Sequence, residues 1–483
     1  MPQSIAHTGN KMLVAGVVIL LASIAGFIYT ASYTVLLAPA LFYYILLKIT
    51  DWKAAFWLML FCIPFSIEVN LSDTLSVSLP DEPMMWLFLL LTMLLIAENP
   101  TRITASFLFH PIAIVVALQF AWLIVAVVFS HVPFLSLKFL IAKVWMLGCF
   151  FILPPLVFKE SKDFKKGFLL LLVPVSATIV YVMVRHAAVH YRFDGINGAI
   201  GALYSNHVEY STIISMVLPL LCMALPVINS RKRWLKILVV ALILFFLIAI
   251  FFTYARAAIL AVIFAVLIAL SIRLKLVNMV MPCFYGFVAL LMVYMINDNK
   301  YIDFRPDYEQ TYMHKGFTDH IIATFKGQDM SSMERLYRWI AAIRMSNDEP
   351  LTGYGPHGFV PHYKPYTVLS FRTYVSNNPE KSTTHNYFLY MLTEQGWPAM
   401  ILYAILITVI FASAQSTYHR FKEPFYKNCT LALAMMVAAC FVNNFFSDLI
   451  ETHKVGALFY LSLSLLVVLD IKSRQVAATH PRP

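Results

Sequence analysis

A histidine, His385, stands directly before a long apolar stretch in the sequence "STTHNYFLYMLTEQGWPAM", after an extended polar segment. A helix N-terminus carries partial positive charge, which disfavours imidazolium and keeps the ring neutral. A neutral imidazole accepts a proton, so His385 is a candidate for positioning or deprotonating a hydroxyl group. From position alone, a histidine that only hydrogen-bonds where an apolar helix meets water is the competing interpretation.

Arg256 lies in "FFTYARAAIL", between two apolar runs that almost no loop separates. An arginine at such a boundary is costly unless its side chain reaches water, pairs with an acid or binds an anion. Arg256 is therefore a candidate anion-binding residue, and the alternative is an arginine that extends to lipid headgroups.

A third candidate, Arg192, lies in the polar segment "VRHAAVHYRFDGINGAIGALYSNHVEYS". The ionisable residues around it are His186, His190, Asp194, His207 and Glu209. Their spacing matches no zinc signature, so we expect no metal here. Glycines at positions 195, 198 and 201 suit a tight backbone, although any loop uses them as well.

Two further arginines, Arg335 and Arg338, are one helical turn apart and could jointly hold a diphosphate, or could lie on a solvated helix face. The turn-forming sequence "PLTGYGPHGF" follows, contains His357, and could close over a ligand. The sequence "NNFFSDLIETHK" near the C-terminus supplies Asp448, Glu451 and His453, which could orient a partner group or only cap helices.

Several sequence motifs that are typical of other classes of protein are missing. No GxxxxGK[ST] sequence is present, so a P-loop does not hydrolyse ATP here. No Asp-x-Asp pair is present to hold a metal-bound sugar nucleotide. Acidic residues are scarce within the apolar runs, which disfavours a proton- or ion-coupled pump.

The elements that must position these residues are membrane helices. The chain has 483 residues, of which 60% are hydrophobic and 13% charged, and its mean hydropathy is +0.75. No soluble domain buries so much apolar surface, so the composition predicts an all-α polytopic membrane protein. The six cysteines lie inside apolar runs without paired spacing, and we expect small core residues rather than disulfides or metal ligands.

A window scan predicts about fourteen apolar segments, or twelve helices if the first pair forms one bent element and short segments are merged. The segments are 12–30, 33–48, 54–68, 82–97, 111–130, 136–158, 167–185, 208–228, 235–252, 256–272, 276–296, 385–411, 429–446 and 454–471. Three regions follow: an N-terminal bundle over 1–296, a polar loop over 297–384 and C-terminal helices over 385–483.

The positive charges alternate with these segments. The clusters "KITDWK", "ENPTRIT", "KESKDFKK", "NSRKRWLK", "RLK", "HRFKEPFYK" and "KSRQ" all fall on one side. The positive-inside rule makes that side cytoplasmic and places both termini there. The net charge of +11 is therefore mainly a topology signal rather than a sign of nucleic-acid binding.

The loop over 297–384 lies on the opposite, outer side and is too long for a simple connector. Its sequence "SSMERLYRWIAAIRMSNDEP" predicts a helix, with Ser331 and Glu334 as a capping box and Pro350 as the stop. The apolar stripe expected on this helix comprises Met333, Leu336, Tyr337, Ile340 and Ile343.

Three elements occur in an order that resembles the O-antigen ligase and O-antigen polymerase superfamily of integral-membrane glycosyltransferases. They are Arg256-x-x-x-Leu260, then "RLYRWIAAIRMSNDEPLTGYGPHGF", then His385 with Gly396 eleven positions later. The sequence "HNYFLYMLTEQG" resembles the His-x10-Gly element of this superfamily, and "DEPLTGYGPHGF" its turn before the histidine. The segment "YRFDGINGAIGALYSNHVEYS" is similar to the earlier outer loop. The resemblance covers roughly residues 185–400.

The resemblance implies a GT-C-like enzyme in the bacterial inner membrane, with its active site facing the periplasm. The implied donor is a glycan on undecaprenyl diphosphate, and the acceptor is a sugar hydroxyl, without a metal or other cofactor. Arg192, Arg256, Arg335 and Arg338 would hold the diphosphate, with Arg335 favoured over Arg338, and His385 would be catalytic. Asn386, Gly396, Asp448 and His357 would support them, and transfer would invert the anomeric carbon.

The resemblance does not fix the identity of the acceptor. A ligase acting on lipid A-core is the favoured reading, and a polymerase joining lipid-linked repeat units is the alternative. A protein O-oligosaccharyltransferase ranks third, because no added C-terminal domain is visible in the sequence. A transporter of lipid-linked glycan is the hypothesis from another class, although it should show charges through several spans and paired repeats.

Overall fold

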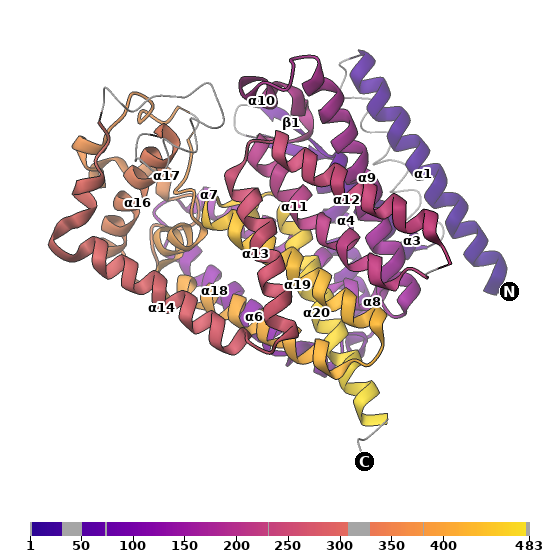
Figure 1. The fold of residues 1–483 in the computed structure, drawn as a ribbon. Coiled ribbons are helices and arrows are strands. Elements are labelled where there is room, and N and C mark those ends of the chain that lie inside the picture. The colour runs from indigo at the N-terminus through magenta and orange to yellow at the C-terminus, as the bar shows by residue number, and fades with distance from the viewer. Residues whose placement is uncertain are drawn as a thin grey trace.

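The computed structural model describes residues 2–30, 51–72, 75–229, 231–307, 329–379 and 381–479. The fold is almost entirely helical (Figure 1). The longer N-terminal elements are α1 (Pro2–Thr30), α3 (Trp52–Cys62), α4 (Asp81–Glu98), α6 (Pro111–Val128), α7 (Pro133–Leu147), α9 (Ser161–Ala187), α11 (His207–Ala224), α12 (Arg233–Phe252), α13 (Arg256–Arg273) and α14 (Val277–Ile296). They are followed by α16 (Met330–Asp348), α18 (Tyr387–Arg420), α19 (Pro424–Phe445) and α20 (His453–Thr479). Four short helices connect them: α5 (Ala105–Leu108), α8 (Pro154–Val157), α10 (Ile196–Ile200) and α17 (Phe359–His362).

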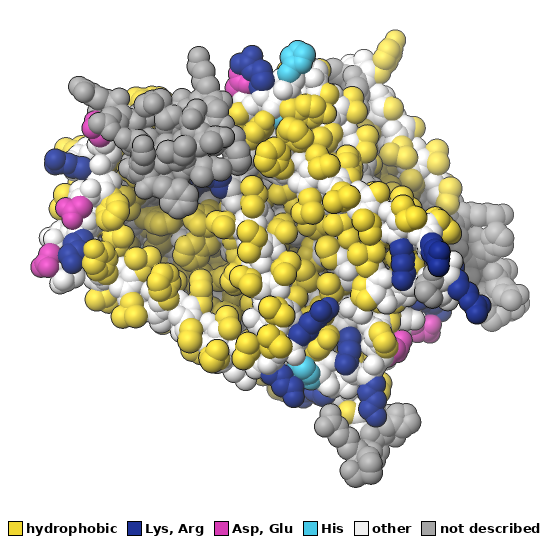
Figure 2. All heavy atoms as spheres, viewed as in Figure 1, with side chains coloured by type: hydrophobic (Ala, Val, Ile, Leu, Met, Phe, Trp, Pro, Cys, Tyr) yellow, Lys and Arg dark blue, Asp and Glu magenta, His cyan; other side chains and the backbone are white. Residues whose placement is uncertain are grey.

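The predicted apolar segments coincide with helices, with two exceptions: the end of 54–68 begins a strand, and 33–48 lies outside the described residues. Among the described residues, ten helices are long and apolar enough to cross a membrane. Two shorter apolar helical runs are Val14–Gly26 in α1 and Trp52–Phe65, which comprises α3 and the short turn after it. Figure 2 shows hydrophobic side chains over most of the visible face, with Lys and Arg gathered along its lower right edge. The all-α polytopic class predicted from composition is confirmed.

The one described sheet is a hairpin between α3 and α4 that the apolar scan did not predict. Strands β1 (Ile67–Ser72) and β2 (Leu75–Leu79) pair antiparallel, with Ile67 opposite Leu79 and Val69 opposite Val77. These four side chains are buried. The sequence signal was the alternation of apolar and polar residues on each side of a short polar turn, which is the period of a half-buried strand.

The six cysteines are free thiols. Four of them, Cys62, Cys149, Cys429 and Cys440, are buried core residues as predicted. Cys222 is partly exposed, and Cys283 is exposed on α14, so the expectation of a core position is wrong for Cys283. Helix α14 has few buried residues, and this explains the exposure of its cysteine.

Helix α16 confirms the helix predicted in the outer loop, including its end before Pro350. Its apolar side packs with the rings of Tyr354, Phe359, Tyr363 and Phe371 and with Leu389 and Leu392 of α18 in a small separate core. The predicted capping box is wrong. The N-cap is Asp329, whose side chain accepts from Ser332 N at 3.2 Å, while Glu334 turns away and accepts from Thr373 and Ser376.

Helix α18 is broken one-third of the way along, at Gly396, where the backbone has φ 77° and ψ −179°. The break exposes backbone groups that the turn after α16 satisfies. Trp397 N donates to Pro350 O at 2.9 Å, and Tyr354 N donates to Thr393 O at 2.9 Å. A Cβ on Gly353 would meet Thr393 O at 2.6 Å, so this approach requires glycine. The sequence "PLTGYGPHGF" is thus a backbone clasp on α18.

We expect Gly396→Ala to destabilise the protein. The left-handed conformation alone costs an alanine about 1–3 kcal/mol, and the new Cβ would overlap the Leu351 carbonyl. Thermal unfolding in detergent measures the effect. The matched control is Gly286→Ala in α14, where a Cβ meets nothing within 4 Å. Equal midpoints for the two variants would contradict this account of the break.

Candidate active site

His385 lies two residues before α18 rather than on the helix itself. The N-cap is Asn386, whose side chain accepts from Phe388 N at 3.0 Å and Leu389 N at 3.1 Å. Its amide group also donates to Phe445 O at 3.1 Å. The supporting residue Asn386 therefore fixes where α18 begins and so where His385 is held.

The segment directly before His385 is anchored at two points. Trp339 of α16 donates its indole N–H to Thr384 O at 2.8 Å. Thr383 Oγ1 donates to Asp448 Oδ2 at 2.6 Å, and the His385 backbone N lies 3.5 Å from that hydroxyl. These anchors hold His385 with φ 50°, in the left-handed region that non-glycine residues rarely adopt. A strained backbone fixed by its surroundings is frequent at functional sites.

The imidazole of His385 is neutral in this environment. Burial is the main cause, and the guanidinium groups of Arg335 and Arg338 add to it, lowering the pKa of His385 to about 3. The sequence predicted a neutral ring from the helix terminus, whereas desolvation and two cations cause it here. No described residue forms a hydrogen bond with the ring, so its nitrogens are available to a ligand.

Arg335 and Arg338 project from the first turns of α16. Arg338 is 6% exposed and donates to Glu334 Oε2 at 3.4 Å. Arg335 donates to Ser331 Oγ at 2.8 Å, and its buried Nε has no hydrogen-bond partner among the described residues. Burial, with repulsion from Arg256 and Arg338, lowers the pKa of Arg335 to about 10. Such mutual repulsion between buried cations favours binding of an anion.

Arg256 is the first residue of α13 and joins the same cluster. Its Nη2 lies 2.8 Å from Oδ2 of Asp329, which is 0% exposed. Asp329 also caps α16, so one carboxylate fixes the membrane helix that carries Arg256 to the loop helix that carries Arg335 and Arg338. The sequence alternatives for Arg256 were pairing, headgroup contact and anion binding, and the structure shows pairing with a buried acid.

The side chain of Arg192, unlike those of the other three arginines, is mostly exposed to solvent. Its side chain is 69% exposed and forms an ion pair of 2.7 Å with its neighbour Asp194. Its loop is attached beside α13, because Tyr254 donates its hydroxyl to the Tyr191 carbonyl. The backbone at Arg192 is therefore near the start of α13, but its guanidinium group points to solvent.

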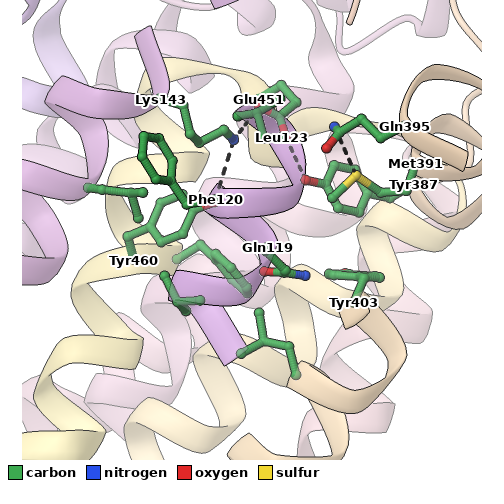
Figure 3. Close-up of a pocket in the computed structure, with 14 residues that line it drawn as sticks. Gln119, Phe120, Leu123, Lys143, Tyr387, Met391, Gln395, Tyr403, Glu451 and Tyr460 are labelled. Atoms are coloured by element: carbon green, nitrogen blue, oxygen red, sulfur yellow. Dashed lines mark hydrogen bonds and ion pairs between the residues drawn. The ribbon is translucent and has the colours of Figure 1, made fainter. Parts of the chain in front are cut away.

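The loop between α19 and α20 lies against the start of α18. Burial raises the pKa of Asp448, which accepts from Thr383. Glu451, one short turn later, accepts from Lys143 of α7 and from the hydroxyl of Tyr387, the first residue of α18. Figure 3 shows Glu451 between these two partners at the edge of a pocket lined by α6, α7, α18 and α20. This network fixes the first turn after His385.

His357 belongs to the clasp rather than to the arginine cluster. Its backbone N donates to Glu394 Oε2 at 2.7 Å, and its ring meets Phe139 edge-on with centroids 5.5 Å apart. Burial lowers the pKa of His357. Gly396 likewise supports the fold of α18, as described above. Both residues affect the site through the position of α18.

Several site residues escaped the sequence interpretation. Asp329 precedes the α16 run and is a preferred N-cap type, which was the signal for it. His207, which the sequence indicated only as a neighbour of Arg192, lies close to Arg335, and its Nδ1 is 2.9 Å from Oδ1 of Asn197. Thr383 and Lys143 gave no sequence signal, since their partners are distant in the chain. The described residues contain no group of three or more His, Cys, Asp or Glu side chains that could hold a metal ion.

The fold and the site define a polytopic membrane protein with arginines from α13 and α16 gathered beside one neutral histidine. Residues 241–404 match the family model described as O-antigen ligase, and over this range the resemblance found in the sequence is confirmed. The matched range contains Arg256, Arg335, Arg338, His385 and Gly396. A comparison with curated proteins found no match.

Proposed function

We propose that the protein is an inverting glycosyltransferase that passes a glycan from undecaprenyl diphosphate to a sugar hydroxyl on the periplasmic face of the inner membrane. The favoured acceptor is lipid A-core, which makes the protein an O-antigen ligase. The observation that carries the proposal is the juxtaposition of Arg335, Arg338 and Arg256 with the neutral His385. The family match supports the reaction class.

In this proposal the acceptor oxygen forms a bond to the anomeric carbon, and the bond from that carbon to the diphosphate oxygen breaks. The departing diphosphate takes the electron pair, and the arginines stabilise its charge. His385 accepts a hydrogen bond from the acceptor hydroxyl and takes its proton as the new bond forms. The positive charge of the arginines stabilises the diphosphate in place of the metal ion that other glycosyltransferases use. The proposed reaction therefore needs no metal ion. Arg192 is the outermost of the proposed diphosphate ligands.

The lipid tail of the donor requires an apolar path next to the arginines. Helix α13 begins at Arg256 and exposes Leu260, Ile263, Leu267 and Leu270 at helical spacing along one side. Helix α14 exposes a comparable apolar face. We propose that the polyprenyl chain lies along this flank, with its diphosphate at the N-terminus of α13.

The proposed topology places α16 and the clasp in the periplasm and both termini in the cytoplasm. The Lys and Arg side chains along the edge near the C-terminal end of α20 in Figure 2 support this orientation. A polymerase that joins lipid-linked repeat units is the second candidate, because it uses the same donor. Protein glycosylation and transport of the lipid-linked glycan rank below it.

Reconstitution tests the proposal. Purified protein receives an undecaprenyl-diphosphate-linked oligosaccharide alone, and then the same donor with lipid A-core. A product that forms only with lipid A-core supports the ligase, whereas a ladder of longer lipid-linked chains from donor alone identifies a polymerase. No product in either reaction, with movement of the donor across the bilayer instead, would overturn the proposal in favour of transport.

The pH dependence should not show a histidine titration. With a pKa of about 3, His385 is already deprotonated throughout pH 5–8. The pH dependence of kcat/KM for the donor reports the ionisation of groups in the free enzyme. Because His385 does not change its charge between pH 5 and 8, it should contribute no pH dependence to kcat/KM over this range. Initial rates at subsaturating donor measure it. A sigmoidal loss of activity centred near pH 6.5 would mean that the ring is solvated, in conflict with the structure.

A further inference from the structure

A second polar pocket lies beside the site, between the β-hairpin and the loops that precede α11 and α20. It is an open pocket with a volume of about 270 Å³. Its walls comprise Ser66, Glu68, Ser78 and Glu82 from the hairpin region, Ala202, Leu203, Tyr204, Ser205 and Glu209 before and in α11, and Glu451, Thr452, His453 and Lys454 at the start of α20. The proposed reaction does not yet give this pocket a role.

Two buried carboxylates in this pocket have unused hydrogen-bonding capacity. Glu82 is 7% exposed and Glu209 is 5% exposed. Oε2 of Glu82 accepts from Ser78 N, and Oε2 of Glu209 accepts both the N–H and the hydroxyl of Ser205. The Oε1 atom of each residue accepts no bond from any described residue. Both Oε1 atoms are therefore open to a ligand that supplies hydrogen-bond donors.

The charge of the pocket is negative. Four glutamates line it, of which Glu451 pairs with Lys143 and Glu82 lies 3.9 Å from the His453 ring nitrogen Nε2. The cation Lys454 bonds the carbonyls of Pro64 and Leu203 and lies over the Tyr204 ring at 4.3 Å. Glu68 and Glu209 have no such cationic partner among the described residues, so the pocket keeps a negative excess. Glu68 is exposed on β1 and forms no hydrogen bond or ion pair through its side chain with a described residue. A phosphate or another anion is therefore repelled, while hydroxyl or ammonium donors are favoured.

The pocket is joined to the site at two points. Glu451, on its rim, is three residues after Asp448, and Glu451 N donates to Asp448 O at 3.1 Å. Asp448 in turn holds Thr383, two residues before His385. On the opposite wall, Glu209 follows His207, which lies close to Arg335. The negative pocket and the positive arginine cluster are thus neighbours on either side of the segment before α18.

We propose that this pocket holds a neutral or amino-bearing sugar residue of the acceptor glycan. The inference rests on the proposed transfer reaction. In a direct displacement the acceptor oxygen approaches opposite the leaving diphosphate, so the two ligands occupy separate subsites. The arginines suit the anionic donor group, and the carboxylates suit the hydroxyls of the acceptor. Carboxylate oxygens accept two hydrogen bonds each and commonly bind sugar hydroxyls in this way.

The test variant is Glu68→Arg, because Glu68 is exposed and its replacement leaves the buried structure intact. The control is Asp303→Arg, a charge reversal at another exposed acidic residue of the outer side. We expect Glu68→Arg to raise the KM for lipid A-core about tenfold or more, the loss expected for hydrogen bonds to a charged group. The KM for the donor should not change, Glu68→Gln should fall between wild type and Glu68→Arg, and Asp303→Arg should match wild type.

A binding measurement separates this proposal from the transfer reaction. Saturation-transfer NMR detects dephosphorylated core oligosaccharide on the full-length protein in detergent, without donor. Signal with wild type that is lost in Glu68→Arg supports the subsite even if no transfer is observed, in which case only the proposed reaction fails. Absence of signal with wild type, an unchanged acceptor KM in Glu68→Arg, or a rise in the donor KM instead would overturn the acceptor subsite.

Discussion

Replacing His385 with alanine should lower the rate of glycan transfer by about 10²–10⁴-fold, the usual contribution of a positioned acid–base group. The reason is that the ring has no other function that is visible in the structure. No described residue bonds to it, whereas its backbone is held by Thr383 and by the capped start of α18. The rate with saturating donor and acceptor measures the loss.

The control for this variant is His190→Ala, which replaces an exposed histidine in the loop after α9. It should transfer glycan at the wild-type rate. His385→Gln adds a further comparison, because an amide oxygen can accept the acceptor hydrogen bond but cannot take the proton. Recovery of most activity in His385→Gln would show that the residue only positions the hydroxyl. Wild-type transfer by His385→Ala would remove His385 from the mechanism.

Replacing Arg335 with lysine should lower kcat/KM for the donor by about 10- to 100-fold, although the positive charge is kept. A lysine has a point charge on a flexible chain and cannot reproduce the planar fork that binds two phosphate oxygens. Arg335 has a buried Nε without a described partner, so its fork is less committed to the protein than that of Arg338, which bonds Glu334.

Arg344→Lys provides the matched control on the same helix. Arg344 is exposed, and its guanidinium group donates to Tyr366 O at 3.3 Å. Its replacement should leave donor kinetics unchanged. Initial rates at several donor concentrations measure both variants. An equal effect at the two positions would mean that Arg335 acts through the stability of α16, and no effect at either would make another arginine the main diphosphate ligand.

The membrane helices could be predicted from the sequence because lipid leaves the backbone few choices. A segment in the bilayer must satisfy its own N–H and C=O groups, so a long apolar run is a helix. The stripe on α16 was predictable for a similar reason, since Tyr337 and Ile340 recur at helical spacing on its buried side. The hairpin was missed because a hydropathy window averages over the alternation of Ile67 and Val69 with polar neighbours.

The contacts that assemble the site could not be predicted in this way. Asp329 lies 73 residues after Arg256, and Asp448 lies 65 residues after Thr383. Such pairs depend on how the helices pack, which local propensity does not specify. The motif order identified the residues that gather, but not that Arg192 points to solvent or that Gly396 receives a clasp. The neutral state of His385 was predicted from the helix N-terminus, whereas burial and the two arginines cause it in the structure.

The clasp on α18 also bears on the order in which the chain is made and inserted. The loop over 297–384 emerges from the ribosome before α18, the helix against which α16 packs. Leu389 and Leu392 of α18 belong to the small core under α16. The backbone of the turn after α16 forms hydrogen bonds with the Thr393 carbonyl and the Trp397 N–H of α18. The part of the chain around α16 therefore completes its fold only once α18 is in place. The cluster of His385 with the arginines is thus assembled late, after most of the membrane helices have been made.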